Sequence, residues 1–449
     1  MDYFVVLFLM LTWIFLYVIA AMSLFMVITV LVIPYFIFKK RKFDFSGLTV
    51  LCCYILVLYV SFAQFYRHAY DLEFVRIGHL TSTEVNLHFR VLEKSELHCS
   101  ELDGTTIKQV LVPLKDNDFI LFKTLVVGKN KLYSCKVTRN GMILMKFHFK
   151  TLSDVPGTTR IAFGSCTKFN FPFMNTEISG FKTILQQQPD FFIMLGDFIY
   201  SDSPMIGGSD YESFAKLYRQ TIELPETKTI FSTIPSYFIA DDHEVRNDYG
   251  GMADPYNEAM KAFYNYASGS NPSNATYFNF TIHNSGFFMF DTRSFRTETT
   301  IIGLEQLEIF KNWATYAKEK YQFIFVCSSV PLTSNFYLNS RDTWAYYQND
   351  KKQVLDALHP RQSIFLTGDR HEFGAVQNDF NLEFSVSPIH QFYLPFNKFY
   401  PYDPILSYTP YGNNKAGFLD IDPNANSVRF YVLINNKLYY NITIQGDLQ

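Results

Sequence analysis

The 449-residue sequence has no block of basic residues outside one short cluster, Lys39–Lys42. Its 39 Lys and Arg are offset by 42 Asp and Glu, so that the formal net charge is −3. Proteins that bind nucleic acid usually concentrate Lys and Arg on one face, and this composition gives no such indication. The chain also contains neither an internal repeat nor a low-complexity tract.

The sequence has only six cysteines, and their positions do not predict a disulfide scaffold. Two lie in an apolar run near the amino terminus, and Cys327 lies in an apolar strand, where a free cysteine behaves as a small hydrophobic residue. Cys99 and Cys135 both fall in a predicted β region and could pair if that region is extracytosolic. Cys166 differs from these, because it ends a predicted strand after Gly-Ser.

No charged side chain lies between Tyr3 and Phe38, and about 20 apolar residues already span a bilayer. A second apolar run, residues 45–65, follows the basic cluster. A cleaved signal peptide has a shorter apolar region, a basic flank before it and a small-residue cleavage site after it, and none of these is evident. We therefore predict that residues 1–66 form two transmembrane helices joined by a basic loop.

The basic loop also predicts the orientation of this hairpin. Short loops rich in Lys and Arg stay cytoplasmic, so the residues after Arg67 are expected to be extracytosolic or luminal. Three glycosylation sequons, at Asn274, Asn279 and Asn441, agree with this orientation. Such sequons also arise by chance in a chain rich in Asn and Thr.

The length of the remaining chain suggests two or three domains, at roughly 100 to 200 residues each. Residues 73–155 show short alternating runs separated by turn signals, which predict a small β-sandwich-like domain. From residue 156 to 449 apolar strands alternate with helical patterns, which predicts a layered α/β domain. Its main strands are expected at 160–165, 191–195, 235–240, 286–291, 322–328 and 363–367, and its helices at 178–185, 254–267, 304–320 and 350–358.

Four of these apolar strands end in residue types that bind metal ions. The carboxyl ends of strands in open α/β sheets form the ligand crevice, so residues distant in sequence converge there. The candidates that we expect to meet in this way are Cys166, Asp197, Tyr200, Asp242, His243, Asp369 and His371.

Each cluster alone has a simpler interpretation. A Gly-Asp pair after a strand is also an ordinary turn, and the four ionisable residues Asp241–Glu244 could form a solvated loop. Burying an unpaired carboxylate is costly, so such residues lie either at the surface or around cations. Cys166 could be a packing residue, a metal ligand or a nucleophile, although no Cys-His-Asn arrangement supports the last. Charged loops after two buried strands favour the metal site.

The chain contains, in order, the motifs FGSC, LGDFIY, DDHEVRND, FDTRSFR, LEQLEIFKNW, RDTWAYY and TGDRHE. In order and approximate spacing they resemble those of PhoD-type alkaline phosphatases and phosphodiesterases, a branch of the metallophosphatases similar to purple acid phosphatases. The resemblance covers about residues 151–384. It implies a metallophosphoesterase-like layered β-sandwich flanked by helices, and the β region before it resembles the fibronectin-like amino-terminal domain common in that family.

The resemblance also implies a metal cluster of iron with calcium or another divalent metal. Cys166, Asp197 and Tyr200 look like iron ligands, with Asp197 bridging to the second metal. The ligands expected to complete the cluster are Asp242, Asp369 and His371.

The resemblance assigns the catalytic roles to three other residues. His243 would protonate the leaving group or hold the phosphate, and Asn247 and Arg293 would contact phosphate or the outer metal. Arg293 could equally pair with Asp291. Glu244 is expected to support the ligands rather than to be one.

These features predict a membrane-anchored phosphoesterase that hydrolyses phosphomonoesters, phosphodiesters or both with metal-activated hydroxide. One alternative is a phosphodiesterase of phospholipid head groups, because the anchor would bring the site near lipids. Another is a non-catalytic, membrane-tethered binding protein that retains the fold. The second alternative predicts missing ligands, whereas all six metal-ligand candidates are present.

Overall fold

The computed structural model describes residues 68–446 apart from 102–103, 105, 156, 169–176, 203–207, 333–340, 379 and 392–404. The predicted membrane hairpin, residues 1–66, lies outside this part of the chain. Among the residues described, no helix is both long enough and apolar enough to cross a bilayer.

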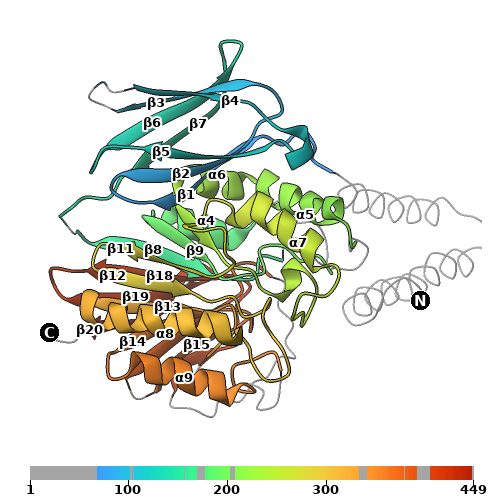
Figure 1. Cartoon of the computed structure of the whole chain (residues 1–449). Helices are drawn as coiled ribbons and strands as arrows, with labels where there is room; N and C mark the ends of the chain where they lie inside the picture. The colour runs from blue at the N-terminus through green and yellow to red at the C-terminus, as the bar shows by residue number, and fades with distance from the viewer. Residues whose placement is uncertain are drawn as a thin grey trace, which may run out of the picture.

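The first strands form two antiparallel sheets, which we call the β module (Figure 1). One sheet has the order β1 (Phe74–Leu80), β2 (Glu84–Arg90), β5 (Ile120–Val126). The other has the order β4 (Thr106–Leu111), β3 (Ser95–Glu101), β6 (Leu132–Arg139), β7 (Met142–Lys150). Cys99 and Cys135 face each other on β3 and β6 and form a disulfide bond. All seven strands lie within the region that the alternating runs predicted.

Two larger mixed sheets follow. The six-stranded sheet has the order β10 (Ser236–Phe238), β9 (Phe191–Met194), β8 (Thr159–Gly164), β18 (Lys415–Asp422), β19 (Ser427–Ile434), β20 (Lys437–Gln445). The seven-stranded sheet has the order β11 (Phe278–Ile282), β12 (Ser285–Met289), β13 (Phe323–Cys327), β14 (Ser363–Thr367), β16 (Asn381–Val386), β15 (Phe373–Asn378), β17 (Ile405–Thr409). Strands β8, β9 and β10 are parallel, as are β12, β13, β14 and β16.

Alternation along the strands places the core between the two sheets and helices on the outside. Ile161 and Phe163 of β8 face the apolar residues of the seven-stranded sheet, whereas Ala162 faces the helices. The helices over the six-stranded sheet are α4 (Ser179–Gln186), α5 (Tyr211–Glu223), α6 (Pro225–Thr233) and α7 (Tyr256–Phe263). Helices α8 (Gly303–Lys320) and α9 (Gln348–Leu358) cover the seven-stranded sheet (Figure 1). The result is a helix-sheet-sheet-helix arrangement, as the layered α/β pattern predicted.

The predicted strands and helices lie close to the observed ones. No helix was predicted at residues 211–233, where α5 and α6 lie, and no strand was predicted at β11, β15, β16 or β17. Every residue of α5 from Phe214 to Ile222 is buried, including Lys216 and Arg219. The helix nevertheless carries the apolar spacing of an amphipathic helix, at Tyr211, Phe214, Tyr218 and Ile222, so the signal for α5 was present in the sequence.

Buried arginines join the β module to the helices and the six-stranded sheet. Arg76 of β1 donates to the carbonyl oxygen of Ser236 at 2.6 Å, and its guanidinium lies 4.4 Å from the ring centre of Phe238. Arg219 of α5 forms an ion pair of 2.9 Å with Asp118 of the β module. The β module is therefore attached through charged groups that are themselves buried.

Replacing Phe430 tests the core between the two sheets. This fully buried ring stacks on Phe384 with centroids 3.7 Å apart and lies near Phe163 and Phe373. Phe430→Ala should lower the free energy of unfolding by about 3–5 kcal/mol through lost contacts and a cavity. Chemical denaturation measures this loss. Phe380→Ala, at a 49% exposed position, is the control and should change stability by less than about 0.5 kcal/mol. Equal losses in the two variants would contradict the assigned core.

Candidate metal centre

The loops after four parallel strands meet at one edge of the two sheets. Cys166 follows β8, Asp197 follows β9, Asp242 follows β10 and Asp369 follows β14. The first three strands belong to one sheet and the fourth to the other. The predicted convergence at the carboxyl ends of strands is therefore observed.

Four of the candidate residues have left-handed backbone conformations. The φ angles are 66° for Cys166, 55° for Asp197, 66° for Asp369 and 58° for His371. For residues other than glycine this conformation costs about 1–3 kcal/mol each and is concentrated at functional sites. Hydrogen bonds between loops hold it: the Cys166 N–H donates to the Gly196 carbonyl at 3.2 Å, and the Asp369 N–H donates to Ser165 Oγ at 3.0 Å.

Gly196 allows the β9 and β10 loops to approach each other. Its φ is 99°, and a Cβ atom placed on it would lie 2.4 Å from the Cβ of Asp241. Only glycine fits such a position without displacing its neighbour. The absence of a side chain here brings Asp197 against the Asp241–Glu244 cluster.

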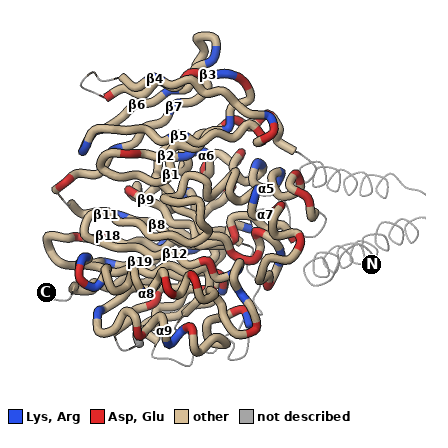
Figure 2. The backbone as a smooth tube through the Cα atoms, viewed as in Figure 1, with Lys and Arg blue, Asp and Glu red and all other residues tan. Residues whose placement is uncertain are grey.

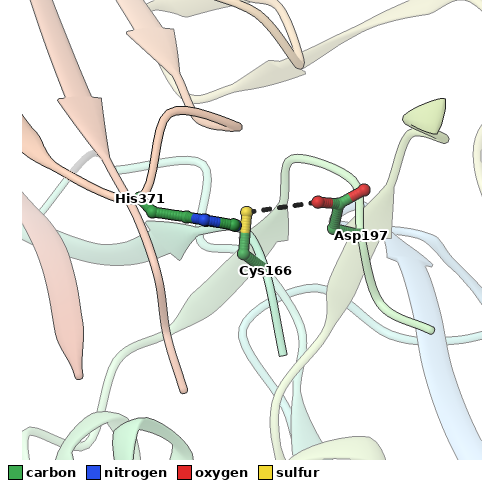
Figure 3. Close-up of side chains that lie close together, drawn as sticks. All are labelled: Cys166, Asp197 and His371. Atoms are coloured by element: carbon green, nitrogen blue, oxygen red, sulfur yellow. Dashed lines mark hydrogen bonds between the residues drawn. The ribbon is translucent and has the colours of Figure 1, made fainter. Parts of the chain in front are cut away.

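Cys166, Asp197 and His371 form the first group of possible metal ligands, with one ligand atom of each within 4.8 Å of the others (Figure 3). Cys166 Sγ lies 3.4 Å from Asp197 Oδ2. The Tyr200 hydroxyl donates to the same oxygen at 2.9 Å and lies 3.2 Å from His371 Nε2. Burial raises the pKa of the Cys166 thiol and the Tyr200 phenol well above their usual ranges, so both are protonated without a cation beside them.

Two further groups share Asp197 with the first. One joins Asp197 to Asp242 and His243, and the other joins it to Asp241, Asp242 and Asp369. In Figure 2 acidic residues gather below α7, in the middle of the molecule. Asp197 belongs to all three groups, and its bridging of two metals stays a prediction. Asp241 was not among the predicted ligands, although it is the first residue of the Asp241–Glu244 cluster.

Asp197, Asp241 and Asp242 are buried and Asp369 is half-buried, and their carboxylates are only partly paired. Burial raises the pKa of Asp197 and of Asp369 well above the usual range. Asp241 Oδ2 and Asp242 Oδ1 are buried and form no hydrogen bond. Oxygen ligands of this kind suit hard cations, and unpaired buried oxygens are otherwise costly. The donor set therefore fits metal ions.

The guanidinium of Arg293 pairs with carboxylates other than that of Asp291. The predicted pairing of Arg293 with Asp291 is therefore wrong for the side chain. The guanidinium donates to Asp241 and Asp342, and its Nη2 lies 3.4 Å from Asp242 Oδ1. Asp291 accepts only the backbone N–H of Arg293, at 2.9 Å. A buried guanidinium requires buried anionic partners, and the loop after β10 supplies two of them.

Asn247 and His243 both contact Asp202, a residue that the sequence analysis did not identify. Asp202 Oδ1 lies 2.7 Å from His243 Nδ1, and Asp202 Oδ2 accepts the backbone N–H of Asn247 at 2.8 Å. Asn247 itself is exposed. Burial alone would lower the pKa of His243, but the carboxylates of Asp242, Asp197 and Asp202 outweigh it and raise the pKa to about 10. No sequence motif identifies Asp202, because its contact with His243 joins two loops that are separate in the sequence.

Glu244 ties the β9 and β10 loops together. Its carboxylate accepts the backbone N–H groups of Asp197 at 3.0 Å, Phe198 at 2.8 Å and Asp241 at 2.7 Å. The side chain is fully buried, and burial raises its pKa to about 7. Glu244 thus positions the predicted bridging carboxylate through the backbone, as expected for a residue that supports the ligands.

Two mixed sheets packed face to face, with clusters of Asp, His and Cys where parallel strands end, form a layered α/β fold with a candidate metal centre. Comparison with solved structures agrees with the fold. A structure titled "Structure of PhoD" superposes with a TM-score of 0.65 at 14% identity, covering 85% of this chain and 89% of that one. The anchor GAP50 of the inner membrane complex of Plasmodium gives a TM-score of 0.46 at 13% identity, covering 66% of this chain and 90% of that one. No curated protein matches the sequence.

The family model for PhoD-like phosphatases matches residues 161–409, more than half of the chain. The chain belongs to the PhoD-like phosphatase family. This match confirms the resemblance seen in the seven motifs, and with it the assignment as a phosphoric ester hydrolase of a metal-dependent family.

Glu244→Gln tests the link between the two loops. An amide would direct its NH₂ group at backbone N–H donors, so buried donors would lose their acceptor at a cost of about 1–3 kcal/mol. We expect lower thermal stability and weaker metal retention, measured by differential scanning fluorimetry and by metal analysis after dialysis. Glu258→Gln, on the exposed face of α7, should change neither. A Glu244→Gln protein with unchanged stability and metal content would contradict this role.

Proposed function

We propose that this chain is a membrane-anchored, metal-dependent phosphoesterase that hydrolyses phosphomonoesters, phosphodiesters or both at the centre around Asp197. The observation that carries the proposal is the membership of Asp197 in all three groups of possible ligands. A carboxylate shared in this way suits a cluster of two or more metal ions.

The donor types suggest how the metals divide. Cys166 and Tyr200 offer a thiolate and a phenolate, which suit iron, and Asp197 and His371 lie beside them. Asp242 and Asp369 offer carboxylates in another group that includes Asp197, and carboxylates suit calcium or another divalent metal. When bound, such ions lower the pKa of a water towards about 7 and offset the charge of phosphoryl oxygens.

The residues of the chain itself would position the substrate and handle the proton. His243 is held at Nδ1 by Asp202, and its ring lies over Tyr200 with centroids 4.2 Å apart. Its Nε2 is therefore the atom that would donate a proton to the leaving oxygen or a hydrogen bond to phosphate. Asn247 lies at the exposed end of the same turn, where it would contact the substrate. Arg293 instead holds the carboxylates of Asp241 and Asp242 in place.

We also propose that the hairpin of residues 1–66 anchors the chain, with the phosphatase portion extracytosolic or luminal and glycosylated. The Cys99–Cys135 disulfide supports this orientation, because disulfides persist mainly in oxidising compartments. The sequon residues Asn274, Asn279 and Asn441 are all exposed, as glycosylation requires.

Asp197→Asn tests the proposed bridging role. Loss of the shared negative charge should reduce kcat/KM for p-nitrophenyl phosphate and bis-p-nitrophenyl phosphate by about 10³-fold or more, since metal ions contribute several kcal/mol to such reactions. Elemental analysis should show loss of stoichiometric metal, iron included. Asp356→Asn, on an exposed turn of α9, is the control and should keep both activity and metal.

Retained turnover in Asp197→Asn would sink the assignment. A wild-type protein with no bound metal and no activity on either ester would instead favour the binding-protein alternative. Hydrolysis of lipid head groups in vesicles without hydrolysis of soluble esters would favour the phospholipid phosphodiesterase.

Asp202→Asn and His243→Gln test the proton donor. The p-nitrophenolate leaving group departs without a proton, whereas phenolate must be protonated as it leaves. General acids raise the rate of such steps by about 10²–10⁴-fold. Both variants should therefore slow phenyl phosphate by about 10²-fold and p-nitrophenyl phosphate much less. Kinetics on the two substrates measure the difference. Equal losses on both would show that His243 binds substrate or metal and does not protonate the leaving oxygen.

A further inference from the structure

The outer sheet of the β module carries a row of basic side chains that the phosphatase site does not use. Lys108 of β4 lies opposite His98 of β3, His98 lies opposite Lys136 of β6, and Lys136 lies opposite Lys146 of β7. The row thus crosses all four strands without a gap. The three lysines are exposed, and no ion-pair partner for them lies within the part of the chain that the structure describes.

This row lies on the solvent side of the sheet. The residues that alternate with it, such as Leu97, Cys135 and Phe147, are buried in the core, so the row points away from the core. Figure 1 shows β3, β4, β6 and β7 at the end of the molecule opposite to α9. The basic row is therefore far from the helices over the seven-stranded sheet and available to a partner.

Side chains directly opposite each other on neighbouring strands lie about 4.5–5.5 Å apart, and like charges so placed destabilise a sheet. Lys136 and Lys146 form one such pair, which is unfavourable for folding alone. The cost is offset if an anionic surface binds there. Lys150 adds a further exposed cation on β7, whereas Glu96, which contacts His98 at 3.2 Å, is the one acidic residue among these outward-facing positions.

The neighbouring row on the same face consists of Val110, Glu96, Thr138 and Ile143 and places aliphatic side chains beside the basic row. Val110 of β4 and Ile143 of β7 stand at its two ends and are 49% and 50% exposed. Nucleic-acid surfaces typically add aromatic rings and Arg to their cations, and neither occurs among the cross-strand partners in these two rows. Lysines beside exposed aliphatic residues instead suit the interface of an anionic bilayer.

We propose that this face of the β module docks on anionic phospholipid head groups. The position of the β module in the chain supports the lipid partner. Residues 67–73 separate the predicted hairpin from β1, and this segment is bound to the β module itself, because Arg90 of β2 donates to the carbonyl oxygens of Tyr70 and Leu72. A bilayer that holds the hairpin would therefore lie within reach of the sheet. This docking is independent of the phosphatase site and sets how the protein is held against the membrane.

Lysine modification on the full chain in vesicles tests the proposal. The reactivity of Lys108, Lys136 and Lys146 towards an amine-reactive reagent is compared by mass spectrometry in phosphatidylcholine vesicles and in vesicles with about 30 mol % phosphatidylserine. We expect at least about fivefold slower modification in the anionic vesicles, reversed by about 0.5 M NaCl, which screens charges beyond about 4 Å. The exposed residues Lys228, Lys320 and Lys437 are internal controls and should react equally in both.

Lys136→Thr separates lipid binding from folding. Threonine is favourable in strands and removes the central charge, so thermal stability should stay the same or rise while protection of Lys108 and Lys146 falls. Lys437→Thr, on exposed strand β20, should leave their protection unchanged. The proposal would be overturned if neutral vesicles protected the three lysines equally well, or if the control lysines were protected to the same degree. Unchanged protection in Lys136→Thr, or protection by duplex DNA alone, would also overturn it.

Discussion

The concentration of buried carboxylates around Asp197 is the constraint on which the rest of the molecule depends. Asp197, Asp241, Asp242 and Asp369 place oxygens within 4.8 Å of one another, and negative charges so close in a buried site repel strongly. The protein offsets part of this charge itself. Arg293 pairs with the Asp241 carboxylate and lies near that of Asp242, and backbone N–H groups surround Glu244. Asp241 Oδ2 and Asp242 Oδ1 still accept no hydrogen bond, and such oxygens fit cations.

The same constraint explains the unusual backbone of the site. Left-handed conformations at Cys166, Asp197, Asp369 and His371 are unfavourable locally, yet they turn the side chains towards one centre. Two features stabilise these conformations. The parallel strands of the two sheets are buried on both faces, and the loops after them are hydrogen-bonded to each other. A site with such demands requires a large core, and the sandwich between α5–α7 and α8–α9 supplies it (Figure 1).

Much of the fold and of the candidate site could be predicted, and the failures have identifiable causes. Strands such as β8, β9 and β14 were found because continuous apolar runs end in polar loops. Helix α5 was missed although Tyr211, Phe214, Tyr218 and Ile222 have the spacing of an amphipathic helix, whereas the burial of its Lys216 and Arg219 depends on tertiary packing. Asp202 was missed because its partner, His243, is 41 residues away.

The sequence by itself determined most of the strands and helices, the residue types that follow the strands of the site, and the family. These properties depend on residues that are close together in the sequence, because the alternation of apolar and polar residues and the turn residues are both local patterns. Only the tertiary structure decided that Asp241 joins the cluster, that the Arg293 guanidinium pairs with carboxylates 49 and 52 residues away, and that three lysines align across the outer sheet. Such contacts depend on how loops and strands are brought together by packing, because charge pairing and register act between atoms that are close in space and distant in sequence.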